Sequence, residues 1–150
     1  MITKKLEEST AMKSVSFSYR RSIYLRDTDA AGVLYFASGM SLCHEAYEEW
    51  LQKQGINLQT ILQEKKIALP IVHCQIDFLR PIFCRDFVEI QLQFTEVTEQ
   101  EFTIAYQIFS VSSPPRLLIK ALSQHVCINP QTRTRMALPE KIKNSLLGEL

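Results

Sequence analysis

Two aspartates and a glycine lie close together in the segment 27–36, at a position suited to chemistry. Asp27 and Asp29 precede Gly32, and two aromatic residues, Tyr35 and Phe36, end the segment. An alternating, strand-like run comes before this segment and a helical pattern follows it, so the carboxylates stand at a helix start. Backbone N–H groups at a helix start are unpaired and favour negative charge. A carboxylate beside such donors is the minimum equipment for hydrolysing an activated acyl group.

The elements that must position these residues are one long helix and five strands. Residues 15–25 alternate between apolar and polar side chains, as in a half-buried strand, although Arg21 interrupts the apolar side. Residues 38–54 repeat apolar side chains at helical spacing, and Gly55 is suited to cap the helix. Four strand-like segments follow, 71–80, 86–95, 101–112 and 116–128. Their short connections favour antiparallel pairing, so the sequence predicts an α+β fold with one helix packed on the sheet.

The composition excludes several classes of function. The 150 residues are 46% hydrophobic and 22% charged with a formal net charge of +1, so nothing indicates a nucleic-acid partner. No run approaches the roughly 18 apolar residues of a membrane span, and the N-terminus lacks the apolar region of a secretory signal. The 4 cysteines form no Cys-x-x-Cys pair. We therefore expect free thiols in a reducing, cytoplasmic compartment and no metal site.

The order of motif and elements resembles the hot-dog-fold acyl-CoA thioesterases of the 4-hydroxybenzoyl-CoA thioesterase family. The resemblance covers about residues 16–130 and begins with Asp-Thr-Asp-x-x-Gly-x-x-Tyr before the long helix. The block 69–78 is similar to the strand that opens the sheet after the helix in that family. Within the family, the chain is similar to the 1,4-dihydroxy-2-naphthoyl-CoA hydrolases of phylloquinone (vitamin K1) biosynthesis at three blocks, 44–51, 69–73 and 125–128.

The pattern and the resemblance divide the chain into three parts. We expect a flexible N-terminal tail over 1–14 and a C-terminal extension over 131–150. Between them, a hot-dog domain over 15–130 is expected, with a five-stranded antiparallel sheet wrapped around the central helix. Short helices are predicted within 57–68 and 139–147.

The resemblance implies that Asp29, the second aspartate of the motif, is the catalytic carboxylate. It would attack the thioester carbonyl or act as a base on water, and the sequence leaves both routes open. Backbone N–H groups around Tyr35 and Phe36 are expected to stabilise the oxyanion. Gly32 is expected to let the chain reverse, and Asp27 to bond N–H groups of the loop. Relatives often carry a histidine after the tyrosine, whereas Phe36 indicates an aromatic wall against an aromatic acyl group.

Simpler roles compete with these assignments. Asp29 and Asp27 are of a type that commonly caps turns and helices. Glu45 is expected to be a solvated charge, although a related thioesterase class carries its catalytic glutamate on this helix. His44 and His73 are candidates for contact with the substrate. For both, as for His125, packing is the alternative.

Coenzyme A enters this interpretation as part of the substrate, so no separate cofactor is expected. Its phosphates should meet basic side chains at the pocket mouth, and the candidates are Arg80, Arg85 and Lys120. One helix leaves an edge strand of the sheet unpaired. Hot-dog subunits pair such edges and place their sites at the dimer interface, so we expect a homodimer that assembles into a homotetramer.

Three functions are therefore compared. The first is hydrolysis of an aromatic acyl-CoA, most specifically 1,4-dihydroxy-2-naphthoyl-CoA. The second is a thioesterase for short or medium aliphatic acyl-CoA or acyl carrier protein, built on the same machinery. The third is a non-catalytic module that binds acyl-CoA, against which the presence of Asp29 argues.

Overall fold

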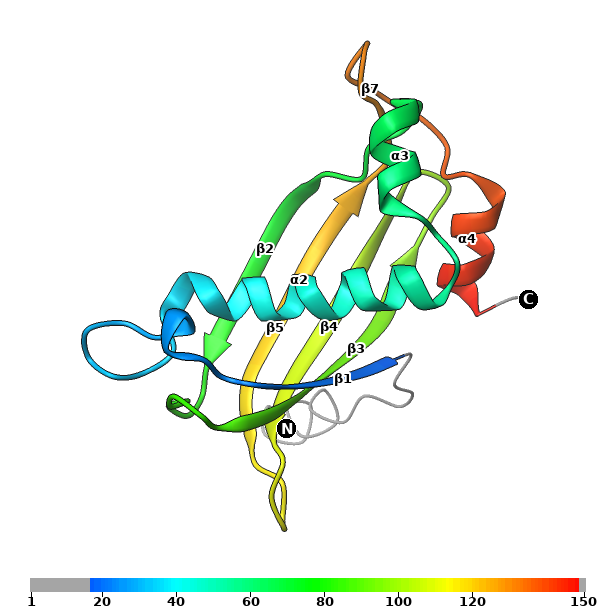
Figure 1. Cartoon of the computed structure of the whole chain (residues 1–150). Coiled ribbons are helices and arrows are strands. Elements are labelled where there is room, and N and C mark those ends of the chain that lie inside the picture. Colours follow the sequence, from blue (N-terminus) through cyan, green and yellow to red (C-terminus); the bar gives the residue numbers. More distant parts are fainter. Residues whose placement is uncertain (1–16, 149–150) are drawn as a thin grey trace, which may run out of the picture.

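The fold is one antiparallel sheet that curves around a single long helix (Figure 1). The computed structural model describes residues 17–148, so the expected tail over 1–14 lies outside the described residues. Helix α2 spans Phe36–Lys53 and follows the first strand. The sheet strands are β1 (Phe17–Ser22), β2 (Ile71–Phe78), β3 (Phe87–Val97), β4 (Glu101–Ser110) and β5 (Leu117–Val126). The predicted α+β hot-dog architecture is confirmed.

The strands stand in the order β1-β3-β4-β5-β2, and every neighbouring pair is antiparallel. Strands β3, β4 and β5 follow one another through tight connections, whereas the excursion through α2 separates β1 from β2 and leaves them at opposite edges. The register sets Ile90 opposite Ile108, and Tyr106 opposite Ala121. Because side chains alternate along a strand, these apolar residues share one face. That face packs against α2.

Helix α2 is 18 residues long and forms because its apolar residues recur at helical spacing. It begins two residues before the predicted start and ends beside Gly55, as predicted. Gly55 has a φ of +75°, and its N–H donates to the carbonyl of Gln52 at 3.1 Å. The side of α2 that is buried against the sheet consists of Gly39, Leu42, Cys43, Ala46, Tyr47, Trp50 and Leu51.

Gly39 brings the first turns of α2 close to the end of β2. A Cβ at this position would lie 2.7 Å from Cδ1 of Ile76 and 3.1 Å from Cε1 of Phe78. A larger side chain would therefore push the helix away from β2 or displace these two side chains. The close approach matters because the candidate site lies at this end of the helix.

The middle of α2 packs on an aromatic core that contains a fully buried histidine. The ring of His125 lies 4.8 Å from that of Tyr47 and stacks on Phe102 at the same centroid distance. Its Nε2 lies 2.8 Å from the Oγ of Ser123. Burial lowers the pKa of His125 to about 4, so the ring is neutral at ordinary pH. Of the two roles considered for His125, the structure therefore shows packing in the core.

Strand β2 is an exposed edge of the sheet. Among the described strands it pairs with β5 alone, and its side chains are exposed along nearly the whole strand. Three of them are large and apolar, with exposed fractions of 41% for Ile71, 52% for Val72 and 47% for Phe78. An apolar edge strand without a neighbour is a template for pairing with another strand.

The C-terminal residues pack back onto the sheet domain. A two-stranded hairpin, β6 (Ile128–Asn129) and β7 (Thr134–Arg135), leads to helix α4 (Glu140–Leu147). Helix α4 buries Ile142 and Leu146, and Lys141 Nζ donates to the carbonyl of Gly55 at 2.9 Å. Helix α3 (Leu58–Glu64) is the short helix predicted before Pro70. Among the helices described, none is long and apolar enough to cross a membrane.

Candidate active site

The loop between β1 and α2 is a tight reversal that presents Asp29. The N–H of Asp29 donates to the carbonyl of Val33 at 2.9 Å, and the N–H of Gly32 donates to the carbonyl of Asp29 at 3.0 Å. Thr28 and Leu34 face each other as an antiparallel bridge across the loop. Gly32 has a φ of +84°, which a residue with a Cβ adopts only at a cost. Gly32 therefore occupies a turn position. A Cβ added to Gly32 would meet no described atom within 4 Å.

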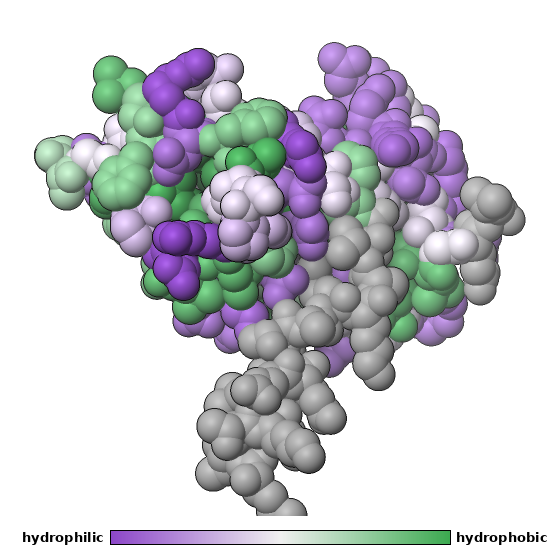
Figure 2. Space-filling model, turned by 90° about the horizontal axis from the view of Figure 1, so that it is seen from below, coloured by the Kyte–Doolittle hydropathy of each residue, from purple (hydrophilic) through white to green (hydrophobic). Residues whose placement is uncertain are grey.

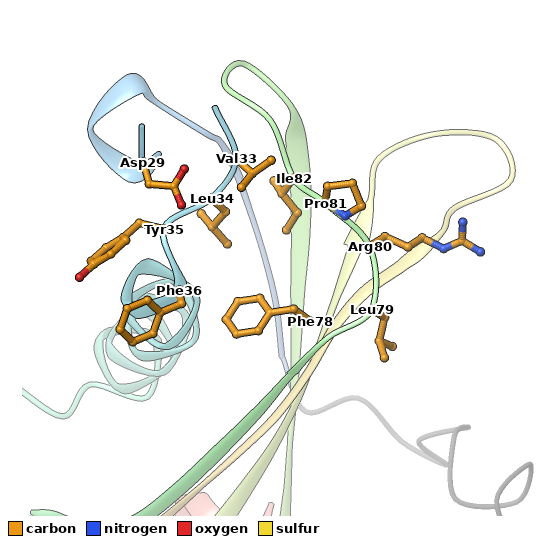
Figure 3. Close-up of a pocket in the computed structure, with 10 residues that line it drawn as sticks. All are labelled: Asp29, Val33, Leu34, Tyr35, Phe36, Phe78, Leu79, Arg80, Pro81 and Ile82. Atoms are coloured by element: carbon orange, nitrogen blue, oxygen red, sulfur yellow. The ribbon is translucent and has the colours of Figure 1, made fainter. Parts of the chain in front are cut away.

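The Asp29 carboxylate is exposed and only lightly held. Its Oδ1 accepts a hydrogen bond from the N–H of Ala31 at 2.8 Å, which fixes its direction within the loop. The carboxylate lines an open hollow of about 380 Å³ at the start of α2 (Figure 3). The other lining residues come from the same loop and from the end of β2 and the segment after it: Val33, Leu34, Tyr35, Phe36, Phe78, Leu79, Arg80, Pro81 and Ile82.

Two phenylalanines line this hollow from different elements. Phe36 begins α2 and Phe78 ends β2, and the ring of Phe78 points toward the start of α2 in Figure 3. The ring of Phe36 packs edge-on against that of Tyr35, with centroids 4.9 Å apart. Phe36 is 66% exposed and Phe78 is 47% exposed, so much of the apolar surface of both residues is open to solvent. The side chain of Tyr35 points away from the hollow. The two phenylalanines therefore give the hollow apolar walls.

The backbone at the helix start supplies donors beside this hollow, but not all of those that the sequence predicted. The N–H of Tyr35 donates to the carbonyl of Asp27 at 2.9 Å, so this donor is already used. The N–H groups of Phe36 and Ala37 have no acceptor among the described residues. Within the predicted pair, Phe36 is therefore the residue with a free donor. Ala37, which lies outside the predicted pair, has a second free N–H donor.

Asp27 has surroundings unlike those of Asp29. It is only 9% exposed, and its Oδ2 accepts from the N–H of Tyr24 at 2.8 Å and from Nη2 of Arg21. Nη1 of Arg21 also binds both carboxylate oxygens of Glu45, at 2.9 Å and 3.0 Å. Arg21 thus joins the loop to α2, and Asp27 bonds a loop N–H group.

The sequence alone predicts no role for Arg21 and a solvated charge at Glu45. The side chain of Glu45 is 39% exposed, so its carboxylate is partly solvated, but it is also held by Arg21 and does not line the Asp29 hollow. A signal for this arrangement was present in the sequence. Arg21 occupies an apolar position of an alternating strand, and a charge in such a place is buried only with a partner.

The predicted histidines lie away from the Asp29 hollow in the single chain. His44 is on α2 with its side chain 44% exposed, and its Nδ1 lies 3.5 Å from a carboxylate oxygen of Glu48. His73 is exposed on β2, on the face of the sheet opposite to α2. Neither residue lines the hollow. Contact with substrate in a pocket completed by a second chain stays a prediction for both.

The three basic residues considered for the phosphates of coenzyme A lie in different parts of the structure. Arg80 lines the hollow, although its side chain extends away from Asp29 in Figure 3. Arg85 lies beside the ring of Tyr24, with its guanidinium carbon 5.6 Å from the ring centroid. Lys120 is opposite Asp77 in the β2–β5 ladder and lines a different hollow on the outer face of the sheet. The single chain therefore brings only Arg80 to the Asp29 hollow.

The cysteines and the acidic groups form no second centre. Cys43, Cys74, Cys84 and Cys127 are free thiols. Burial raises the pKa of Cys43 to about 12, so its thiol stays protonated. In the part of the chain that the structure describes, no group of histidine, cysteine and acidic side chains is arranged to hold a metal ion.

Comparisons with known proteins agree with this geometry. Residues 23–146 match the model of the Thioesterase-like superfamily. A 1,4-dihydroxy-2-naphthoyl-CoA hydrolase from Crocosphaera subtropica is 50% identical over 121 residues, which cover 81% of this chain and 88% of that protein. A hydrolase of the same name from Gloeothece citriformis is 49% identical over 122 residues, covering 81% of this chain and 85% of the relative.

A solved structure extends the comparison to three dimensions. The crystal structure of a 1,4-dihydroxy-2-naphthoyl-CoA thioesterase from Synechocystis has a TM-score of 0.83 and 39% sequence identity to this chain. The match covers 87% of this chain and 95% of the other. The chain therefore belongs to the thioesterase-like superfamily and is a thioester hydrolase of the hot-dog fold.

Proposed function

We propose that this protein hydrolyses 1,4-dihydroxy-2-naphthoyl-CoA to 1,4-dihydroxy-2-naphthoate and coenzyme A, a reaction of phylloquinone biosynthesis. One observation carries the proposal for the site. A single carboxylate, Asp29, lines a hollow whose walls include the side chains of Phe36 and Phe78. Offset or edge-to-face contacts between the naphthoyl ring system and these phenyl rings would be favourable. The names of the relatives from Crocosphaera subtropica and Synechocystis support the same substrate.

Asp29 is the catalytic group of the proposed reaction. As a nucleophile, its free carboxylate oxygen attacks the thioester carbonyl carbon, the C–S bond breaks, and coenzyme A leaves as a thiolate that takes a proton from water. Water then hydrolyses the mixed anhydride and restores the carboxylate. As a base, Asp29 instead takes a proton from water that attacks the same carbon. A single turnover in ¹⁸O-labelled water separates the two routes, because only the anhydride route can leave label in Asp29.

The negative charge on the former carbonyl oxygen requires donors that are already in position. In this proposal the N–H groups of Phe36 and Ala37 supply them, since both lie at the start of α2 and neither has an acceptor among the described residues. The positive end of the helix dipole adds to their effect. Donors of this kind typically contribute about a hundredfold or more to the rate.

The active form in this proposal is a homodimer that assembles into a homotetramer. The exposed edge of β2 carries Ile71, Val72 and Phe78, and pairing with the same strand of a second copy would cover it. Phe78 belongs both to this edge and to the Asp29 hollow, so the second copy would also close the pocket. Sedimentation of the purified protein tests this part. A monomer at micromolar concentration would contradict it.

A panel of acyl-CoA substrates tests the proposed function. Hydrolysis of 1,4-dihydroxy-2-naphthoyl-CoA is measured by thiol release beside benzoyl-CoA, hexanoyl-CoA and acetyl-CoA. We expect the highest kcat/KM for the naphthoyl substrate and a low value for the aliphatic ones. A preference for alkyl chains would identify an aliphatic thioesterase, and binding without hydrolysis of any substrate would identify a binding module. Either of these two results would overturn the proposal.

A further inference from the structure

Three arginines surround one exposed tyrosine beside the Asp29 loop. The guanidinium carbons of Arg21, Arg26 and Arg85 lie 5.6 Å, 5.3 Å and 5.6 Å from the ring centroid of Tyr24. Tyr24 is 45% exposed, so its ring is open to solvent as well as to the arginines. We name Tyr24, Arg26 and Arg85 the arginine–tyrosine cluster.

The charge of this cluster is not balanced by an ion pair among the described residues. Arg21 is matched by Asp27 and Glu45. Arg26 and Arg85 are exposed, and neither makes an ion pair with any residue in the described part of the chain. Two uncompensated guanidinium groups that converge on one ring create a positive potential. Guanidinium groups bind phosphates through paired, charge-assisted hydrogen bonds, so an anionic ligand is favoured here.

The backbone holds Arg85 at this place by a conformation that is uncommon for arginine. Its φ is +73°, in the left-handed region that favours glycine. The N–H of Arg85 donates to the carbonyl of Ile23 at 2.7 Å, and the N–H of Ile23 donates to the carbonyl of Asp86 at 2.8 Å. These two bonds place Arg85 directly beside Tyr24. A residue held in such a region is a reason to look for a function.

The segments that form the cluster also form the Asp29 hollow. The N–H of Leu34 donates to the carbonyl of Ile82 at 2.8 Å, and Val33 faces Phe83 as an isolated bridge. The loop before α2 thus runs beside the segment after β2. In Figure 2, hydrophobic side chains gather at the end of the molecule where these two segments lie, with strongly hydrophilic side chains among them. One ligand with an apolar end and an anionic end would match both features.

We propose that Tyr24, Arg26 and Arg85 bind the nucleotide end of the coenzyme A thioester, with the arginines on its phosphates and the tyrosine ring against its adenine. The inference rests on the proposed function, because that function supplies the ligand. Coenzyme A carries a diphosphate and a ribose 3′-phosphate, which match two free guanidinium groups. Aromatic rings and guanidinium planes also stack on nucleobases.

The test compares a full substrate with a truncated one. We measure kcat/KM for an aromatic acyl-CoA and for the N-acetylcysteamine thioester of the same acid, which lacks the nucleotide. The double variant Arg26→Gln/Arg85→Gln should lower the ratio of the two values about a hundredfold, or about tenfold per arginine, through a higher KM for the CoA thioester. Tyr24→Leu should lower the ratio about tenfold through lost stacking.

Matched variants control the test. Arg116→Gln removes an exposed arginine of the β4–β5 connection and should leave the ratio at the wild-type value. Arg85→Lys keeps the charge and should restore much of the ratio, which a merely structural role of Arg85 would not explain. An unchanged ratio in the folded double variant would overturn the inference.

Direct binding separates this inference from the proposed function. If the wild-type protein hydrolyses neither thioester, the proposed function fails, and calorimetry with free coenzyme A still tests the cluster. The wild type should bind coenzyme A more tightly than dephospho-coenzyme A, and the double variant should lose most of this affinity. Inorganic phosphate that displaces coenzyme A at equal concentration would overturn the assignment to a nucleotide. Equal binding of coenzyme A by the double variant and the wild type would also overturn it.

Discussion

Asp27 and Asp29 lie two residues apart in one loop, yet their surroundings are opposite. Asp27 is buried against Arg21 and the N–H of Tyr24, and it joins the loop to α2 through the ion pair with Arg21. Asp29 is exposed, accepts one hydrogen bond from Ala31 and faces an open hollow. The difference shows how a short loop separates two tasks. One carboxylate is held by charge inside the fold, and the other stays open to solvent at the hollow.

The largest effect is expected for the exposed member of the pair. Asp29→Asn should lower kcat about 10²–10⁴-fold, because the amide neither attacks a carbonyl nor takes a proton from water. The melting temperature should stay within a few degrees of the wild type, since an amide oxygen still accepts from the N–H of Ala31. Thiol release and circular dichroism measure the two quantities.

Glu45→Gln is the matched control for this prediction. It removes the carboxylate that was considered as a rival on α2, and it should cost far less activity than Asp29→Asn. A loss of equal size in the two variants would contradict the assignment to Asp29.

Replacing Asp27, the buried member of the pair, should lower the stability of the fold. Asp27→Ala leaves Arg21 with only one of its carboxylates and the N–H of Tyr24 without its acceptor. The expected loss is about 3 kcal/mol in the free energy of unfolding. Urea denaturation measures it, and Glu96→Ala, which removes an exposed carboxylate, serves as the control. If Asp27→Ala were as stable as the control, the loop would not depend on this ion pair.

A third residue, His125 in the core, makes the stability of the fold depend on pH. His125 has a pKa of about 4 in the folded protein, below the value of about 6.5 of an unfolded histidine. Folding therefore favours the neutral ring. Its contribution is complete above pH 6.5 and is lost as the pH falls toward 4, at no more than about 1.4 kcal/mol per pH unit.

His125→Gln removes this titration from the core. Chemical denaturation at pH 7 and pH 5 should show a smaller difference in stability for the variant than for the wild type. Equal differences in the two proteins would mean that the acid sensitivity arises elsewhere, and the carboxylates of the loop would then be the first to test.

The smallest effect is expected at the turn that presents Asp29. Gly32→Ala should cost about 1 kcal/mol in the free energy of unfolding, because a Cβ disfavours the left-handed conformation of this residue. The cost is purely conformational, since no described atom would meet the added methyl group. Ala30→Gly, in the same loop, controls for a general change in loop flexibility. A gain in stability from Gly32→Ala would show that the loop adopts another conformation in solution.

Much of the fold could be predicted because the signals are local and periodic. Alternation over 71–80 and 86–95 gave strands that the structure places at Ile71–Phe78 and Phe87–Val97. The first strand was predicted too long. It ends at Ser22, because the N–H of Tyr24 bonds the carboxylate of Asp27 and a 3₁₀ turn follows over Leu25–Asp27. A side-chain acceptor of this kind leaves no trace in the period of hydrophobic residues.

The candidate site was predictable in part for the same reason. Asp29 and Phe36 are neighbours in sequence, so the motif alone places them at one helix start. Phe78 and Arg80 come from a distant segment, and only the packing of β2 against α2 at Gly39 brings them there. Lys120 and Arg85 are also basic, but they do not line the hollow.

By itself, the sequence determined the secondary structure, the order of the elements and the loop that carries the acid, because short-range periodicity and turn chemistry decide these features. The tertiary structure decided which of the two aspartates is buried, which basic side chain reaches the hollow, and that Arg26 and Arg85 converge on Tyr24. Those outcomes depend on contacts between residues far apart in the chain. Their energies are set by burial and by charge at close range, which no local pattern records.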